Sequence, residues 1–213
     1  MTTGRTHEDA LAAAIAAERR DLADLFDTLS PDQWDAPSLC AGWRVRDVVA
    51  HMSTGFRYPT RRMLWELARS GGRVNRMADR VARADAAAHP AGRLSGFLRE
   101  HAHHPWKPPV GGRPAALAHD VVHGLDVTVA LGVERPVPEE RLRPALATID
   151  PRAFRFFGVD LAGVRLQAVD LDWTFGAGAP LCGSAQDLLL VAYGRKLPVG
   201  RLDGQEVHRF VTA

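Results

Sequence analysis

Two histidines spaced four residues apart are the strongest chemical signal in the sequence. They are His119 and His123, in the segment HDVVH. Because a helix turns once in about 3.6 residues, two such side chains project from one face, about one turn apart. Their imidazoles can then bind one metal ion, at about 2.1 Å each if the ion is zinc. The alternative is that one histidine lies at the surface and the other makes a hydrogen bond in the core.

A third ligand must come from another part of the chain, and His51 is the best candidate. It lies among the apolar residues Val48, Val49 and Met52. A lone histidine in such a place is commonly a core residue with a satisfied hydrogen bond. Combined with the histidine pair, however, it predicts a metal site between two facing helices of a bundle. Three neutral imidazoles leave a fourth position open, which is typical of catalytic rather than structural zinc sites.

The elements that must position these histidines are helices. Apolar residues recur at the spacings of an amphipathic helix along much of the first two thirds of the chain. We predict helices at 8–29, 45–58, 74–88, 94–101 and 115–131. Pro59 is expected to bend or restart the second of them. Long helices with short connections around a shared core predict a four-helix bundle over residues 1–132.

After residue 132 the pattern of the sequence changes. Prolines punctuate a connector, and alternation of apolar and polar residues indicates strands joined by a tight turn. We predict helices at 139–148 and 184–193, and strands at 164–171, 173–176 and 200–211. Residues 133–213 are therefore interpreted as a connector and a small α+β domain. The predicted fold is mainly α, and α+β overall.

The composition is that of an ordinary globular protein. Of its 213 residues, 46% are hydrophobic and 24% are charged, which argues against a disordered, fibrous or coiled-coil chain. The 27 Lys and Arg residues nearly balance 25 Asp and Glu residues, for a net charge of +2. Acidic and basic residues alternate instead of forming a basic stripe, so we expect no nucleic-acid partner.

Two further features bear on where the protein acts. The N-terminal segment is polar and lacks the apolar core of a secretory signal, and no run of about 18 apolar residues is present. Cys40 and Cys182 lie far apart and form no C-x-x-C pair, which excludes a disulfide framework. We expect a cytoplasmic protein with no membrane partner, in which both cysteines are buried structural thiols.

Three segments spread along the chain carry a family resemblance. Residues 42–51 read GWRVRDVVAH, residues 122–132 read VHGLDVTVALG, and residues 184–190 read SAQDLLL, followed by Gly194-Arg195. They resemble, in the same order, the G-W-(T/S)-V-x-D-(V/L)-x-A-H, V-H-G-x-D-(I/V)…A-L-G and G-x-A-x-D-L-L-L…G-R segments of the mycothiol-dependent maleylpyruvate isomerase family. The combination covers nearly the whole chain and is more specific than any one segment.

The resemblance implies a DinB-like four-helix bundle followed by a small α/β domain. It also implies that the first metal ligand is His51 and the last is His123. The middle ligand of the family, often a glutamate, falls on His119. This difference changes the charge of the site by one unit. Because no ligand carboxylate then offsets the charge of the ion, a three-histidine site should favour an anionic thiolate.

The resemblance further implies a thiol cosubstrate. In the family this thiol is mycothiol, which replaces glutathione in actinobacteria. The Arg-rich, Lys-poor composition of the chain is compatible with such a source. A divalent metal, with zinc expected first, would bind the thiol, lower its pKa and present a thiolate to a small electrophilic substrate. Expulsion of the thiol after rotation about the former double bond gives an isomerase, whereas a retained adduct gives an S-transferase.

Two other residues are candidates for catalytic roles. Asp47 lies four residues before His51 and can accept a hydrogen bond from that imidazole, or it can act as an acid at a helix start, which we favour. Arg195 offers a two-pronged donor for a substrate carboxylate. The other interpretation is that Arg195 stabilises a helix C-terminus. Asp126 is expected to be a structural hydrogen-bond acceptor.

Several alternatives stay open from the sequence alone. The same three ligands can activate water in a hydrolase, and a non-catalytic small-molecule-binding protein can keep the bundle without the chemistry. His101, His103 and His104 stand in a proline-rich loop that we expect to face solvent, although folding over the bundle would bring one of them to the pocket. The electrophile is not identified, and pairing of the chain into a homodimer stays open.

Overall fold

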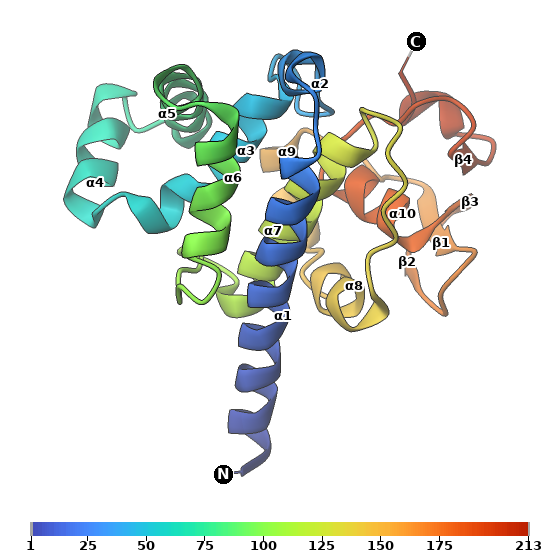
Figure 1. Ribbon diagram of the computed structural model, residues 1–213. Coiled ribbons are helices and arrows are strands. Elements are labelled where there is room, and N and C mark those ends of the chain that lie inside the picture. Colours follow the sequence, from blue (N-terminus) through green and yellow to red (C-terminus); the bar gives the residue numbers. More distant parts are fainter. Residues whose placement is uncertain (1, 213) are drawn as a thin grey trace.

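A bundle of helices forms most of the molecule. The structure, a computed structural model, describes residues 2–212. The long helix α1 (Thr2–Asp27) runs through the bundle and extends beyond it at its N-terminal end (Figure 1). It packs against α6 (Ala91–Glu100) and α7 (Gly112–Thr128), and α3 (Val45–Arg57) packs against both of these helices. The predicted mainly helical bundle is confirmed.

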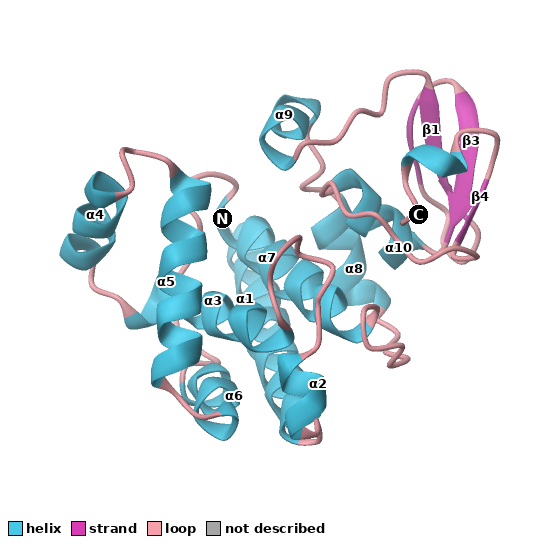
Figure 2. Ribbon diagram, turned by 90° about the horizontal axis from the view of Figure 1, so that it is seen from above, coloured by secondary structure: helices cyan, strands magenta, loops and turns pink. Residues whose placement is uncertain are grey.

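Shorter helices surround this bundle. Ser30 caps α2 (Pro31–Asp35), where its side chain accepts a hydrogen bond from the backbone N–H of Gln33. Of the predicted bend or restart at Pro59, the structure has the restart, because α3 ends at Arg57 and α4 (Thr60–Arg69) begins after the proline. Helix α5 (Val74–Ala88) has the predicted bounds and packs against α3. In Figure 2, α4 lies at the outer edge of the bundle, beside α5.

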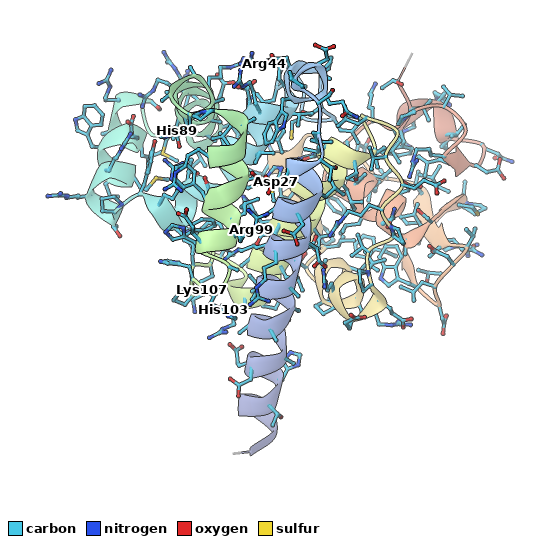
Figure 3. All side chains as sticks on the ribbon, in the orientation of Figure 1. Asp27, Arg44, His89, Arg99, His103 and Lys107 are labelled. Atoms are coloured by element: carbon cyan, nitrogen blue, oxygen red, sulfur yellow. The ribbon has the colours of Figure 1, made fainter. Side chains whose placement is uncertain are left out.

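Polar contacts join the ends of two bundle helices, α1 and α6. Arg99 of α6 pairs with Asp27 at the end of α1, with 2.6 Å between Nη2 and Oδ2, and the same guanidinium reaches Asp24 at 2.7 Å. Figure 3 shows Asp27 and Arg99 facing one another across the two helices. Both pairs are partly exposed, so we expect each to contribute little free energy.

The C-terminal part combines short helices with a sheet. The helices are α8 (Glu139–Leu146), η1 (Pro151–Ala153), α9 (Phe154–Phe157), α10 (Ala185–Ala192) and η2 (Val207–Arg209). The strands are β1 (Val164–Ala168), β2 (Thr174–Gly176), β3 (Ala179–Gly183) and β4 (Leu202–Asp203). Their order in the sheet is β2-β1-β3-β4, with β1 parallel to β3 and the other neighbours antiparallel.

The predicted strand pair is confirmed, with Leu166 of β1 opposite Phe175 of β2. Strand β3 was not predicted, because Pro180 and Gly183 interrupt any alternation of apolar and polar residues. The turn before β3 depends on Gly178, whose φ is +129° and where a Cβ would collide with the backbone of Gly163. Only glycine fits this close approach.

Two clusters of buried apolar side chains stabilise the fold. One joins α1 and α7 to α8, α10 and the sheet, and the other joins the end of α1 to α3 and α6. Helix α7 contributes Val121 and Leu125 to the first cluster and Val127 to the second. The C-terminal part therefore shares its core with the bundle, and the division at residue 132 stays a prediction. Among the helices described, none has the length and apolar character of a membrane span.

Candidate metal centre

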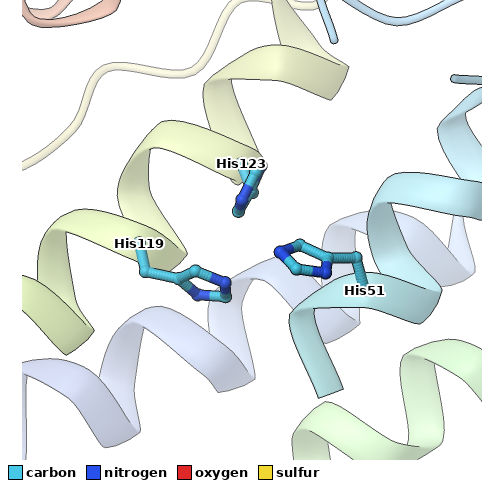
Figure 4. A group of neighbouring side chains, drawn as sticks. All are labelled: His51, His119 and His123. Carbon is cyan, nitrogen blue, oxygen red and sulfur yellow. The ribbon is translucent and has the colours of Figure 1, made fainter. Parts of the chain in front are cut away.

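The three histidines predicted as ligands lie together where α3 faces α7. The ring centroids of His51 and His119 are 5.3 Å apart, those of His51 and His123 are 5.0 Å apart, and those of His119 and His123 are 4.7 Å apart. One ligand atom from each ring lies within 4.8 Å of the others. Figure 4 shows the three rings turned toward a shared space, two from α7 and one from α3.

The apolar faces of the two helices bring the rings together. Val48, Val49 and Met52 of α3 are fully buried, and His51 stands among them on the side that faces α7. On α7 the spacing of four residues places His119 and His123 on one face, as predicted. Burial of these faces orients the imidazoles before any ion is present.

The imidazole of His119 is held from behind by a buried ion pair. Its Nδ1 donates a hydrogen bond to Oδ1 of Asp120 at 2.9 Å. The other oxygen of Asp120 accepts a bond from Nε of Arg19 at 2.8 Å, and both side chains of this pair are fully buried. Because Nδ1 carries the proton, the Nε2 lone pair of His119 is left for a ligand.

His123 has a similar support. Its Nδ1 donates to Oδ2 of Asp126 at 3.0 Å. Arg195 holds Asp126 with two bonds, from Nε to Oδ1 at 2.8 Å and from Nη2 to Oδ2 at 2.7 Å. The thiol of Cys40 donates to the same Oδ2 at 3.0 Å and accepts from Nη2 of Arg195 at 3.3 Å. Asp126 is thus the structural acceptor that the sequence predicts.

Arg195 lies directly behind a ligand histidine. Its guanidinium has five N–H groups. Two bond to Asp126, one to Cys40 and one, on Nη1, to the carbonyl of Tyr193 at 2.7 Å. The two-pronged grip expected for a substrate carboxylate is thus made on Asp126. Binding of a substrate carboxylate by Arg195 stays a prediction.

The third histidine, His51, has a different environment. Its Nδ1 is buried and has no hydrogen-bond partner among residues 2–212, and Trp43 contacts its ring edge-on at 5.1 Å between centroids. Asp47 accepts a bond from the backbone N–H of Arg44 at 3.0 Å and so caps the start of α3. This is the helix-start role that we favoured, and the hydrogen bonds described give Asp47 no bond to His51.

Burial favours the neutral forms of the His51 and His123 imidazoles. It lowers the pKa of His51 well below the ordinary value, and the neighbouring histidines lower it further. Burial also lowers the pKa of His123 to about 4, against the hydrogen bond that His123 donates to Asp126, which raises it. Burial alone would raise the pKa of Asp126, but the charge and hydrogen bonds of Arg195 bring it below its ordinary value. Neutral imidazoles beside ionised carboxylates are the protonation states that metal binding requires.

Tryptophan, not histidine, comes to the site from the proline-rich loop. The indole of Trp106 contacts the ring of His119 at 5.2 Å, edge-on. His101 stacks on Phe56 at 5.4 Å, while His103 and His104 are exposed. Figure 3 shows His103 at the lower end of α6, beside α1. These loop histidines are absent from the groups of described residues that are close enough to share an ion.

The donor set fits a divalent ion. Two of the histidines have Nδ1 held by a carboxylate, so their remaining nitrogens face the shared space, and His51 completes the set from the opposite helix. Each carboxylate is paired with an arginine, so the supports add no net charge to the site. Zinc, nickel, iron and manganese all accept imidazole nitrogen.

The fold and this cluster are typical of helical bundles in which side chains on facing helices can hold a metal ion. Residues 15–105 match a family model described as the mycothiol maleylpyruvate isomerase N-terminal domain. Over these residues the match confirms the family resemblance stated from the sequence. The match includes His51 and ends before His119 and His123.

Solved structures show the same fold. The chain is similar to the crystal structure of the mycothiol-dependent maleylpyruvate isomerase, with a TM-score of 0.57 and 16% identity over 93% of this chain and 92% of that one. It is equally similar to a histidine-to-alanine variant of that isomerase, with a TM-score of 0.55 and 15% identity over the same shares. Among curated proteins no match was found. The chain therefore shares the fold of that isomerase.

Sequence reasoning missed part of the support. Asp120 follows His119 directly, and neighbours along a helix point about 100° apart, so the spacing does not predict their hydrogen bond. Arg19 and Cys40 are distant in sequence from the ligands that they support. In contrast, Asp126 lies three residues after His123, a spacing at which helical side chains meet.

Proposed function

We propose that this protein is a metal-dependent enzyme that activates a low-molecular-weight thiol, with mycothiol as the thiol and zinc as the metal. The thiol would add to a small electrophilic substrate, either to isomerise a cis double bond or to form a stable thioether. The observation that carries the proposal is the convergence of three imidazoles from α3 and α7, in a fold shared with a mycothiol-dependent isomerase.

The residues of the chain would hold the ion and keep the site electrostatically balanced. His51, His119 and His123 would be its ligands, and Asp120 and Asp126 would keep two of these rings in the ligating orientation. A bound divalent ion would lower the pKa of a thiol, so that the thiolate is available near neutral pH. Because Arg19 and Arg195 neutralise the two carboxylates, no local negative charge opposes an anionic thiolate.

Two indoles limit how much water surrounds the site. Trp43 contacts His51 of α3 and Trp106 contacts His119 of α7. Apolar surface therefore lies beside the candidate ligands of both helices. Lower local polarity strengthens electrostatic interactions between an ion and a thiolate. The same apolar surface would favour a thiol over water as the group that is activated.

The first test is elemental analysis of the purified protein and of two ligand variants, His51→Ala and His123→Ala. We expect about one ion per chain, lost from both variants while their helical circular dichroism is retained. His208→Ala is the matched control, because His208 is exposed and lies on η2, in the C-terminal part. An intact protein that stays free of metal after reconstitution would reject the proposal.

The second test distinguishes thiol from water as the activated group. The metal-loaded protein is assayed with a cis-enoate substrate and with an ester substrate, each with and without mycothiol. Turnover of the enoate only when the thiol is present supports the proposal. Ester hydrolysis that is independent of thiol would support the hydrolase instead, on the same three ligands.

A further inference from the structure

A buried arginine joins the loop that covers the site to one of the ligands. Arg19 lies near the middle of α1 and is fully buried, although arginine is rarely found in a protein core without a partner. Its neighbour along the chain, Glu18, is also buried but pairs with Arg135 and Arg141, near α8. Arg19 has a different set of contacts, which connect three separate parts of the structure.

The first set of contacts leads to the ligand. Nε of Arg19 donates to Oδ2 of Asp120 at 2.8 Å, and Oδ1 of Asp120 accepts from Nδ1 of His119 at 2.9 Å. With Asp120 fully buried, its carboxylate needs a cation nearby, and Arg19 is the cation that contacts it. The position of Arg19 therefore determines the position of the carboxylate that orients His119.

The second set leads to the loop at residues 101–111, which connects α6 to α7 and is called the α6–α7 loop below. Nη1 of Arg19 donates to the backbone carbonyls of His101 at 3.2 Å, Ala102 at 3.4 Å and His104 at 3.0 Å. The guanidinium also lies 4.8 Å above the ring of Phe56, on which His101 stacks. Arg19 thus binds the first turn of the loop through its backbone carbonyls.

The α6–α7 loop in turn carries Trp106. The backbone N–H of Trp106 donates to Nδ1 of His104 at 3.1 Å. The turn that Arg19 binds therefore also positions the backbone of Trp106. The indole contacts His119 of α7 and packs so closely on Gly55 of α3 that a Cβ there would collide with it. It also lines a cavity of about 250 Å³ between the loop and α1.

We propose that Arg19 is a positioning residue that couples closure of the α6–α7 loop to the orientation of the ligand His119. The inference rests on the proposed function, because it takes His119 as a metal ligand. When the loop is closed, Arg19 is held by its three carbonyls and aligns Asp120 behind His119. Opening of the loop would release those carbonyls, move Trp106 away from His119 and weaken the support of the ring at the same time.

Coupling of this kind must work in both directions. If loop closure favours metal binding, metal binding favours loop closure by the same factor. Binding of zinc is therefore expected to slow hydrogen exchange of backbone amides in the α6–α7 loop. This readout belongs to the loop and does not depend on catalytic activity.

The experiment measures zinc affinity by chelator competition and hydrogen exchange of residues 101–108 with and without zinc. Arg19→Lys keeps a positive charge but cannot reach Asp120 and three carbonyls together. The double variant Arg19→Met/Asp120→Asn removes both charges, so that no buried charge is left unpaired. Arg141→Met is the matched control, because it also breaks a buried ion pair to α1 but has no contact to the ligands.

For wild type and Arg141→Met we expect the same zinc affinity and slower loop exchange when zinc is bound. For both Arg19 variants we expect affinity reduced at least about tenfold, as for other groups that orient a ligand, and loop exchange that no longer responds to zinc. Arg19 variants that keep wild-type affinity and wild-type exchange response would overturn the coupling alone. A wild-type protein that binds no zinc would overturn the coupling and the proposed function together. If Arg19→Lys does not fold, the double variant is judged by the same criteria.

Discussion

Arg195 and Asp126, which lie 69 residues apart in the sequence, form a two-pronged ion pair directly behind a candidate metal ligand. Both oxygens of the carboxylate are engaged, and Oδ2 also accepts bonds from His123 and Cys40. A planar guanidinium fits this geometry, whereas an ammonium group does not. The pair therefore gives His123 a fixed orientation that a single hydrogen bond would not supply.

We predict that Arg195→Lys weakens zinc binding by about 10- to 100-fold, because lysine cannot hold both oxygens of Asp126. The measurement is chelator competition on the folded variant. Arg201→Lys is the control, since Arg201 pairs with Asp187 away from the histidines. If Arg195 acts instead by binding a substrate carboxylate, KM would rise while zinc affinity stays at the wild-type value.

We predict that Gly55→Ala moves the indole of Trp106 away from the ligands without unfolding α3. The new Cβ would collide with the indole, while alanine itself favours the helix by about 1 kcal/mol over glycine. Acrylamide should quench the tryptophan fluorescence more strongly in the variant. This increase should vanish when Trp106→Phe is also present.

Gly96→Ala provides the comparison for this substitution. Gly96 lies within α6, and no atom lies closer than 3.9 Å to the added methyl group. This variant should gain stability without any change in quenching. Equal quenching in wild type, Gly55→Ala and Gly96→Ala would show that Trp106 is not displaced.

We predict that the metal-free protein loses stability as the pH falls from about 6.5 to about 4. Burial lowers the pKa of His123 from 6.5 to about 4, so in this window the unfolded state binds the proton more readily than the folded state. The contribution of His123 to stability therefore rises with pH and reaches its full value above the ordinary histidine pKa of 6.5. At 1.36 kcal/mol per pKa unit the contribution is on the order of 3 kcal/mol. Urea unfolding at several pH values measures it, and His123→Gln should flatten the profile.

We predict that Cys40 reacts slowly with alkylating reagents in the folded protein. Burial raises the pKa of its thiol above the ordinary value, and the negative charge of Asp126 raises it further. In a Cys182→Ser background, iodoacetamide should modify Cys40 at least about tenfold more slowly in the native protein than in urea. Rapid modification of the native protein near pH 7.5 would mean that Cys40 is an available nucleophile.

Local spacing was enough to predict which three histidines lie together. His119 and His123 follow the period of one helix, and His51 stands out as a polar residue in an apolar face. The helix bounds at 74–88 and the strand pair around Leu166 also follow from local patterns. In each case the pattern lies within a short stretch of sequence, where the period of a helix or strand relates sequence directly to structure.

The supports of the ligands could not be predicted in this way. Arg19 is 101 residues from Asp120, and Cys40 is 86 residues from Asp126, so only the packed fold brings them together. Trp106 reaches the site from an irregular loop, whose path has no sequence period. Strand β3 was missed for a related reason, since it gains its order from pairing with β1 and β4 rather than from its own composition.

The two apolar clusters have a consequence for the order in which the site matures during synthesis. Helix α3, which carries His51, is made first and packs in one cluster, while α7 delivers the other two imidazoles and belongs to both clusters. Arg195, which fixes Asp126, is made only after strands β1, β2 and β3 and helix α10. A nascent chain that has just completed α7 would present three imidazoles but lack the guanidinium behind His123. Tight retention of the ion is therefore expected to begin only when the C-terminal part has packed onto α7.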